Sequence, residues 1–215
     1  MKIVILCLAI IVVLFCGFWV VSKYNYPSAV TPSTSSSYSQ TPTESIGTNL
    51  NFGLPISDAV QRITKKPFGI FVSPHNSPIS PEKFTGYHTG VDFEIFQGEE
   101  NKDVPIYAIC DGQLLQKRTA SGYGGVAIQK CQINSQTITV IYGHLKLSSI
   151  DPVLGEDISK GQQIAILGKS NSPETDGERK HLHLGIHKGS SIDIKGYVQN
   201  KSDLVNWINF EEYVR

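Results

Sequence analysis

The sequence predicts a mostly β fold, an antiparallel β-sandwich or half-barrel with few short helices, preceded by one N-terminal transmembrane helix. Three observations support this prediction. After residue 50, seven short segments alternate apolar and polar residues, which is the period of a half-buried strand. The 215 residues include 19 glycines and 11 prolines, a content that favours frequent turns. Residues 3–21 form an apolar run without a charge.

The length and charge of the chain limit its domain count and its partners. At roughly 100–200 residues per domain, a chain of 215 residues is expected to hold one folded domain and additional segments. The 19 Lys and Arg residues balance the 19 Asp and Glu residues, so the formal net charge is zero. A neutral chain gives no electrostatic reason to expect a nucleic acid partner.

Residues 1–22 are predicted to be a transmembrane anchor or a signal segment. At 1.5 Å per helical residue, the apolar run has about the length of the 30 Å bilayer core. It is also longer than the roughly 7–15 apolar residues of a cleaved signal peptide. We therefore expect a single-pass protein of the cell membrane with its folded domain on the extracytoplasmic side. Secretion after cleavage is the alternative.

Residues 23–50 are predicted to form a flexible linker. Between positions 27 and 48, 15 of 22 residues are Ser, Thr or Pro, so this segment has little apolar surface to bury. The folded domain is then expected to cover residues 51–215.

The elements of this domain follow from spacing and turn residues. Ile56, Ala59, Val60 and Ile63 stand at helical spacing and predict a short opening helix. Residues 170–180 read as a surface loop that forms one wall of a cleft, and residues 202–215 as short helical turns. The predicted strands are 90–95, 105–110, 113–117, 125–131, 137–142, 163–167 and 181–187.

Two cysteines fall at the ends of predicted strands. If the domain is exported, Cys110 and Cys131 can form a disulfide bond. Two unpaired buried thiols are the alternative. The spacing of the pair does not indicate a zinc site built from thiolates.

Histidines with one aspartate form three motifs. His88 and Asp92 are four residues apart and would share a face of one extended segment. His181 and His183 alternate in the same way on a strand, with leucines on its other face. His144 ends a further strand. Two imidazoles and one carboxylate suit Zn²⁺ when a fourth position is left to water, although the same set also serves non-haem iron.

These motifs carry a family resemblance. The segments 87–93, 142–145 and 181–186 read YHTGVDF, YGHL and HLHLGI. In this order they resemble the signature motifs of the lysostaphin-type (LytM-like) zinc metalloendopeptidases of bacterial cell walls. The resemblance covers residues 67–188, which form the motif-bearing core of the domain, and leaves out the linker and the C-terminal tail.

The resemblance implies a function and a set of site residues. His88, Asp92 and His183 would bind Zn²⁺, while His144 and His181 would be catalytic without binding the metal. The chain would be a membrane-tethered, zinc-dependent endopeptidase that hydrolyses peptide bonds in the stem peptides or cross-bridges of peptidoglycan. The resemblance indicates no particular protein partner, and it leaves open which bond is cut.

Two other functions fit parts of the sequence. A non-catalytic module of the same fold could bind peptidoglycan or activate a separate hydrolase. An iron oxygenase could use the same two histidines and carboxylate. Among the remaining candidates, His75 is expected in an exposed loop and His187 at a rim or in solvent. Three strand tyrosines are expected either to line a groove or to pack in the core: Tyr87, Tyr107 and Tyr142.

Overall fold

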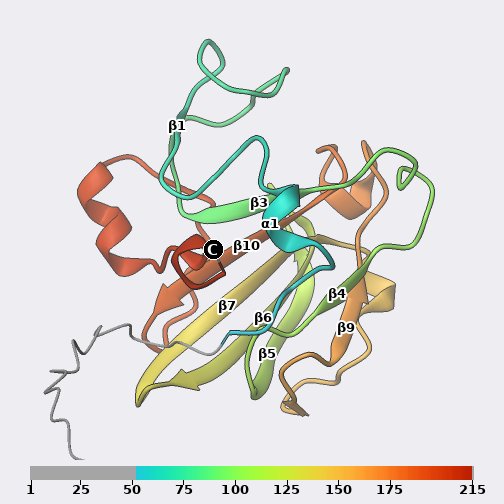
Figure 1. Cartoon of the computed structure of the whole chain (residues 1–215), viewed down its shortest axis with the longest axis vertical. Coiled ribbons are helices and arrows are strands. Elements are labelled where there is room, and N and C mark those ends of the chain that lie inside the picture. Colours follow the sequence, from blue (N-terminus) through green and yellow to red (C-terminus); the bar gives the residue numbers. More distant parts are fainter. Residues whose placement is uncertain (1–51, 215) are drawn as a thin grey trace, which may run out of the picture. The chain divides into compact units, whose positions relative to one another are not determined.

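The computed structural model describes residues 52–214, and eleven strands provide most of the regular structure there (Figure 1). All of these residues belong to one compact unit, Ile46–Arg215. The predicted anchor, residues 1–22, and the predicted linker, residues 23–50, lie outside the described residues.

Six strands form one antiparallel sheet. Their order across the sheet is β3-β10-β7-β6-β5-β8, and each strand runs opposite to its neighbours. β5, β6 and β7 are consecutive in sequence and joined by short turns, whereas β10 inserts between β7 and β3. The bounds are β3 Gly90–Glu94, β10 His181–Lys188, β7 Gln136–Leu145, β6 Gly124–Ile133, β5 Gly112–Ala120 and β8 Asp157–Ile158.

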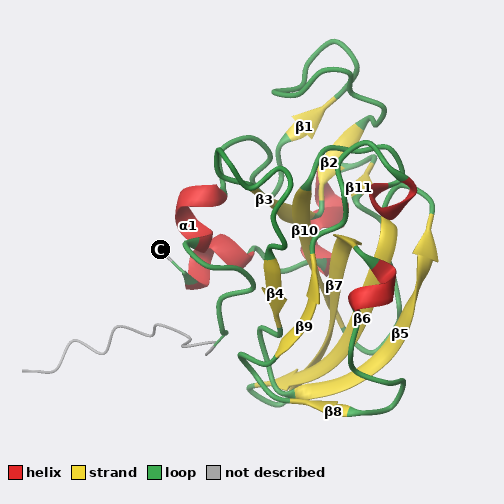
Figure 2. Ribbon diagram, turned by 90° about the vertical axis from the view of Figure 1, so that its right-hand side faces the viewer, coloured by secondary structure: helices red, strands yellow, loops and turns green. Residues whose placement is uncertain are grey.

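Two smaller sheets accompany this large one. β4 (Pro105–Tyr107) pairs with β9 (Gln163–Ile166) and lies in front of the large sheet in Figure 1. β2 (Gly86–His88) pairs with both β1 (Phe71–Val72) and β11 (Tyr197–Val198). In Figure 2 this three-stranded sheet lies at the upper end of the molecule, above β10. It therefore stands next to the end of β10 that carries the HxH motif.

The helices of the described region are short. α1 is a single turn, Ala59–Arg62, and the other four are 3-10 helices. Within residues 52–214, no helix has the length and apolar character needed to cross a membrane. The 3-10 helices are η1 Leu147–Ser149, η2 Pro173–Thr175, η3 Lys201–Asn206 and η4 Phe210–Tyr213.

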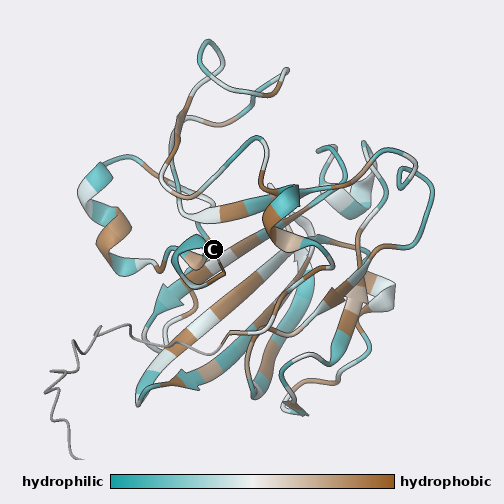
Figure 3. Ribbon diagram, viewed as in Figure 1, coloured by the Kyte–Doolittle hydropathy of each residue, from teal (hydrophilic) through white to brown (hydrophobic). Residues whose placement is uncertain are grey.

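The main core lies on one face of the large sheet. In β10 the buried Leu182, Leu184 and Ile186 point into this core, together with Ile106 of β4 and Ile164 of β9. Figure 3 shows the alternation of apolar and polar residues along β7 and β10. Full burial of one large aliphatic side chain stabilises the fold by about 1.5–3 kcal/mol. Because successive strand residues face opposite sides, the residues between these leucines point to the other face of the sheet.

A disulfide bond joins Cys110, which precedes β5, to Cys131 of β6. Both cysteines are buried in the main core. In the chain-entropy model, closing a loop of about 20 residues contributes roughly 3 kcal/mol to stability. Of the two alternatives for these cysteines, the structure has the bonded one.

The structure confirms the mostly β, antiparallel prediction with few short helices. The seven predicted strands correspond to β3, β4, β5, β6, β7, β9 and β10, and the 3-10 helices η3 and η4 form the predicted C-terminal turns. The predicted strand 105–110 was too long, because β4 ends at Tyr107. Strands β1, β2, β8 and β11 were missed, since each has only two or three residues and shows no readable alternation.

Candidate metal centre and active site

Strand register places Asp92 beside the HxH motif. In the β3–β10 pair, His183 lies directly opposite Asp92, and His181 lies opposite Glu94. All four side chains therefore project from the face of the sheet that is opposite to the main core. The predicted sharing of one face by His181 and His183 is confirmed, because both rings approach the Asp92 carboxylate.

His88 reaches the same place from a different sheet. The prediction of one extended segment from His88 to Asp92 was wrong, because Thr89 separates β2 from β3. The two side chains nevertheless meet, with His88 Nε2 at 3.2 Å from Asp92 Oδ1. Gly90 makes this possible, since a Cβ at this position would lie 2.8 Å from the ring of His183.

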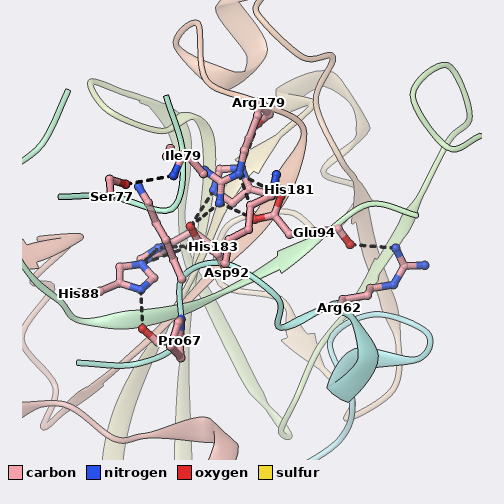
Figure 4. Close-up of polar contacts among 12 residues, drawn as sticks. Arg62, Pro67, Ser77, Ile79, His88, Asp92, Glu94, Arg179, His181 and His183 are labelled. Atoms are coloured by element: carbon pink, nitrogen blue, oxygen red, sulfur yellow. Dashed lines mark hydrogen bonds and ion pairs between the residues drawn. The ribbon is translucent and has the colours of Figure 1, made fainter. Parts of the chain in front are cut away.

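Three potential ligand atoms form a nearly equilateral triangle (Figure 4). His88 Nε2 lies 3.0 Å from His183 Nδ1 and 3.2 Å from Asp92 Oδ1. His183 Nδ1 lies 3.1 Å from Asp92 Oδ1. At bond lengths of about 2.0–2.1 Å, neighbouring ligands of a tetrahedral zinc ion lie about 3.3 Å apart. The spacing and the chemistry of these three buried residues therefore fit a zinc ion with little rearrangement.

Main-chain carbonyl oxygens set the tautomers of two rings, His88 and His181. His88 Nδ1 donates to the carbonyl oxygen of Pro67 at 3.2 Å, which leaves Nε2 with a free lone pair. His181 Nδ1 donates to the carbonyl oxygen of Arg179 at 2.9 Å, so in the neutral ring the lone pair is on Nε2, the atom that lies 3.3 Å from Asp92 Oδ2. Within residues 52–214, the buried Nε2 of His183 has no hydrogen-bond partner.

Burial and neighbouring charges shift the pKa values of the site. Burial alone would raise the pKa of Asp92. The electrostatic interactions of its carboxylate with His181 and His88 outweigh this effect and hold the pKa well below its usual value. Burial lowers the pKa of His183 to about 4. Burial, and then the neighbouring His181, also lower the pKa of His144 well below its usual value. At neutral pH the site therefore has an ionised carboxylate, and His144 and His183 are neutral.

A β-bulge places His144 in the site. Gly125 of β6 pairs with Leu145 of β7, and Val126 pairs with Gly143, so His144 is an extra residue on β7. Its φ of 61° lies in the left-handed region, which costs a non-glycine residue about 1–3 kcal/mol. Without the bulge, His144 would follow Tyr142 toward the core. With it, the ring of His144 lies 4.2 Å from that of His181.

Four of the five candidate residues line a cavity of about 520 Å³. Asp92, His144, His181 and His183 form part of its wall. Glu178 and Arg179, from the end of the loop 170–180, contribute to another part, as predicted for that loop. The other lining residues are Lys66, Phe84, Thr85, Ser121, Gly122, Tyr123, Ile192, Asp193, Ile194, Lys195, Gly196, Tyr197 and Gln199.

The other predicted candidates lie outside this cavity. His75 is exposed, as expected. His187 was expected at a rim or in solvent; it is half-buried, and its ring centroid lies 4.9 Å from that of Trp207, so it is not a fully exposed residue. Tyr142 is a core residue whose hydroxyl group accepts a hydrogen bond from the amide of Ile109. Tyr87 and Tyr107 do not line the cavity.

The sequence reasoning missed several residues around the cavity. Tyr123 is almost fully buried, and its hydroxyl group has no partner within residues 52–214. The Tyr197 hydroxyl group accepts a hydrogen bond from the buried Lys66 at 2.9 Å. Arg179 binds Asp92 directly. Two of these residues could have been found from their positions in the sequence. Tyr123 lies in a glycine-rich turn, and Arg179 lies two residues before His181.

The chain is similar to known proteins in its sequence and in its fold. Residues 86–194 match the sequence profile of Peptidase family M23. Endolysin 2638A of Staphylococcus phage 2638A is 29% identical over 139 residues, which cover 61% of this chain and 27% of the endolysin. The chain thus spans only about a quarter of the length of this curated relative.

Two solved structures are among those similar to the chain. The catalytic domain of lysostaphin from Staphylococcus simulans has 18% identity and a TM-score of 0.48, with coverage of 73% of this chain and 97% of that one. LytU has 22% identity and a TM-score of 0.46, with coverage of 71% and 90%. The family profile covers more than half of the chain and includes all five candidate residues: His88, Asp92, His144, His181 and His183. The chain belongs to peptidase family M23.

Proposed function

We propose that the chain is a membrane-tethered, zinc-dependent endopeptidase that hydrolyses peptide bonds in peptidoglycan. One observation carries the proposal: three potential ligand atoms lie 3.0–3.2 Å apart, and His144 and His181 line the same cavity as the candidate ligands Asp92 and His183. A site that only bound metal for stability would not need those two additional imidazoles. Membership of a peptidase family supports the proposal.

His88, Asp92 and His183 would hold the metal. Their ligand atoms are all buried, and the hydrogen bond from His88 Nδ1 to the Pro67 carbonyl oxygen leaves His88 Nε2 as an acceptor. Bound zinc would polarise the scissile carbonyl group and lower the pKa of a water molecule to about 7. The remaining steps depend on residues of the chain that do not bind the metal.

His181 is suited to accept a proton. Its Nδ1 donates to the carbonyl oxygen of Arg179, which leaves Nε2 as the acceptor on the side of Asp92. From there it takes the proton of the attacking water and later returns it to the leaving amine. This role requires a neutral ring in the resting protein.

His144 is suited to donate a hydrogen bond. Burial keeps its pKa low, so the ring is neutral and retains one N–H group. Its Nδ1 is buried and has no partner within residues 52–214. His144 lines the cavity, where the N–H group of a neutral imidazole can stabilise the oxyanion that forms at the scissile carbonyl. The bulge at His144 supports a functional role, because left-handed strain in a non-glycine residue concentrates at active sites.

Peptidoglycan is the proposed substrate class. A curated relative is an endolysin, and a solved structure similar in fold is described as an antimicrobial peptidase. The cavity of about 520 Å³ is large enough for several residues of a short peptide. The stem peptides and the cross-bridges of peptidoglycan are both short peptides, so both meet this requirement of size.

The proposed tether consists of residues 1–22 followed by the linker 23–50. A flexible linker of this length has a root-mean-square span on the order of 25–30 Å, which would let the domain act just outside the membrane. The Cys110–Cys131 disulfide supports an extracytoplasmic position, since disulfides persist in oxidising compartments.

The test is digestion of purified cell-wall sacculi, with mass spectrometry of the released fragments. The purified chain is incubated with zinc, with a chelator, and as the variants His144→Ala and His75→Ala. The exposed His75 provides a matched control. We expect new amino termini only with zinc and with intact His144, and full activity for His75→Ala. Adherence to sacculi without any released fragment would contradict an endopeptidase and favour a binding module.

A further inference from the structure

Arg179 makes the most extensive set of ionic contacts around the candidate metal site. Its Nη2 lies 2.8 Å from Asp92 Oδ2 and 2.6 Å from Glu94 Oε1. Its Nε donates to both carboxylate oxygens of Glu94 at 3.0 Å. The side chain is 19% exposed, whereas that of Asp92 is 2% exposed. The guanidinium group thus bridges two buried carboxylates on the same face of β3 (Figure 4).

The two oxygens of Asp92 have different surroundings. Oδ1 faces the candidate ligands, at 3.2 Å from His88 Nε2 and 3.1 Å from His183 Nδ1. Oδ2 faces the other way, toward Arg179 Nη2 at 2.8 Å and His181 Nε2 at 3.3 Å. A carboxylate without such a partner can turn and offer both oxygens to a metal. Here the ion pair occupies the second oxygen.

The position of the guanidinium group is itself fixed by Glu94. Three hydrogen bonds hold Arg179 on this carboxylate, and Glu94 lies opposite His181 in the strand register. Arg179 precedes His181 by two residues, and its carbonyl oxygen also accepts the hydrogen bond of the His181 ring. One residue therefore orients Asp92 through its side chain and His181 through its main chain.

We propose that Arg179, held by Glu94, is a positioning residue that restricts Asp92 to binding metal through Oδ1 alone. This keeps the coordination number low, so that a site remains open for water and substrate. The inference rests on the proposed function, since it requires that the triangle binds zinc. A lysine would not replace the arginine fully, because one ammonium group cannot span both carboxylates with the same planar set of bonds.

Charge and geometry must be separated in the test. Removal of Arg179 alone would leave Glu94 without its main cation and make the site more negative, which by itself favours a divalent cation. The double variant Arg179→Met with Glu94→Gln removes one positive and one negative charge together. Arg118→Met is the matched control, because Arg118 is an exposed arginine of β5 whose hydrogen bonds within residues 52–214 go to its near sequence neighbours Gln116 and Thr119.

The experiment measures metal binding, not activity. Zinc affinity of the full chain is determined by competition with a chromophoric chelator, for the wild type, the double variant, Arg179→Lys and Arg118→Met. Co²⁺ is then used as a spectroscopic probe, because its visible absorption weakens when the coordination number rises from four. Thermal melts without metal show whether each variant folds.

We expect the double variant to bind zinc roughly 10–100-fold more weakly, as is typical when a partner of a metal ligand is removed. Its Co²⁺ absorption should weaken as Asp92 Oδ2 becomes a second ligand. Arg179→Lys should fall between the double variant and the wild type, and Arg118→Met should match the wild type.

Unchanged zinc affinity and Co²⁺ absorption in a folded double variant would overturn the inference while leaving the zinc site intact. If the double variant does not fold, Arg179→Lys decides, and wild-type affinity and absorption for this variant would overturn the inference. If the wild type itself binds no zinc, the proposed function fails and the inference fails with it.

Discussion

Replacement of His144 by glycine should abolish activity while sparing the stability of the fold. His144 is the extra residue of a bulge in β7 and has a φ of 61°. Replacement by alanine removes the same imidazole but keeps a Cβ in the strained left-handed conformation. The two variants therefore differ mainly in backbone strain, and a comparison of their unfolding free energies isolates it.

The magnitude follows from two opposing effects. The left-handed conformation costs a residue with a Cβ about 1–2 kcal/mol, which glycine avoids. Glycine also makes the unfolded chain more flexible, which costs about 0.4–1 kcal/mol relative to alanine. The difference leaves His144→Gly more stable than His144→Ala by roughly 0.5–1 kcal/mol.

Urea denaturation followed by fluorescence or circular dichroism measures this difference. Thr137 of the same strand provides the control, because it is outside the bulge and does not have a positive φ. There the order should reverse, with Thr137→Gly less stable than Thr137→Ala by about 0.5–1 kcal/mol. If the glycine variant is less stable than the alanine variant at both positions, the strained bulge is not a feature of the folded protein. If His144→Gly retains cleavage activity, the catalytic role of the ring is wrong.

Three further predictions concern packing, charge and the disulfide. Gly90→Ala should cost about 1–3 kcal/mol in urea unfolding and weaken zinc binding, because the new Cβ would lie 2.8 Å from the His183 ring; unchanged zinc affinity would contradict this. Lys66→Met should cost about 3–5 kcal/mol, because it leaves the carboxylate of Glu82 buried without the cation that lies 2.6 Å away. Burial alone would raise the pKa of Glu82, but hydrogen bonds from Lys66 and others lower it below 4.5. Ionised Glu82 therefore stabilises the folded protein fully above pH 4.5. This stabilisation is lost as the pH falls through the lowered pKa of Glu82. An acid-unfolding profile of Glu82→Gln as steep as that of the wild type below pH 4.5 would contradict the assignment. Cys110→Ala should lower stability by roughly 2–5 kcal/mol under oxidising conditions and have a much smaller effect under reducing ones, whereas equal losses in both would exclude the bond.

Much of the fold was predictable from the sequence because its long strands alternate. In β10, leucines alternate with histidines. This pattern predicted one face toward the core and one toward the site, and the structure has both. The small sheet that contains His88 was not predictable, because strands of two or three residues have no measurable period. For the same reason, the sequence pattern did not reveal the break between β2 and β3 at Thr89, and it predicted one extended segment from His88 to Asp92.

The candidate site could be predicted only in part from the sequence. The motifs identified the five residues that the structure brings together, but alternation alone would place His144 on the core side of β7. The bulge that turns it arises from pairing with Gly125 and Val126, at the open end of the hairpin that β6 and β7 form. Arg179 was missed for a related reason. Its role depends on the two carboxylates of β3, more than 80 residues away, and no local pattern records that contact.

The central claim is that three buried side chains hold one catalytic zinc ion. The most direct measurement removes metal from the purified chain with a chelator and then adds zinc in steps, while counting new amino termini released from sacculi. We predict that release is absent without metal, recovers with zinc and saturates at one ion per chain, and that the variant Asp92→Asn does not recover. Equal release with and without zinc, or full recovery by Asp92→Asn, would contradict it.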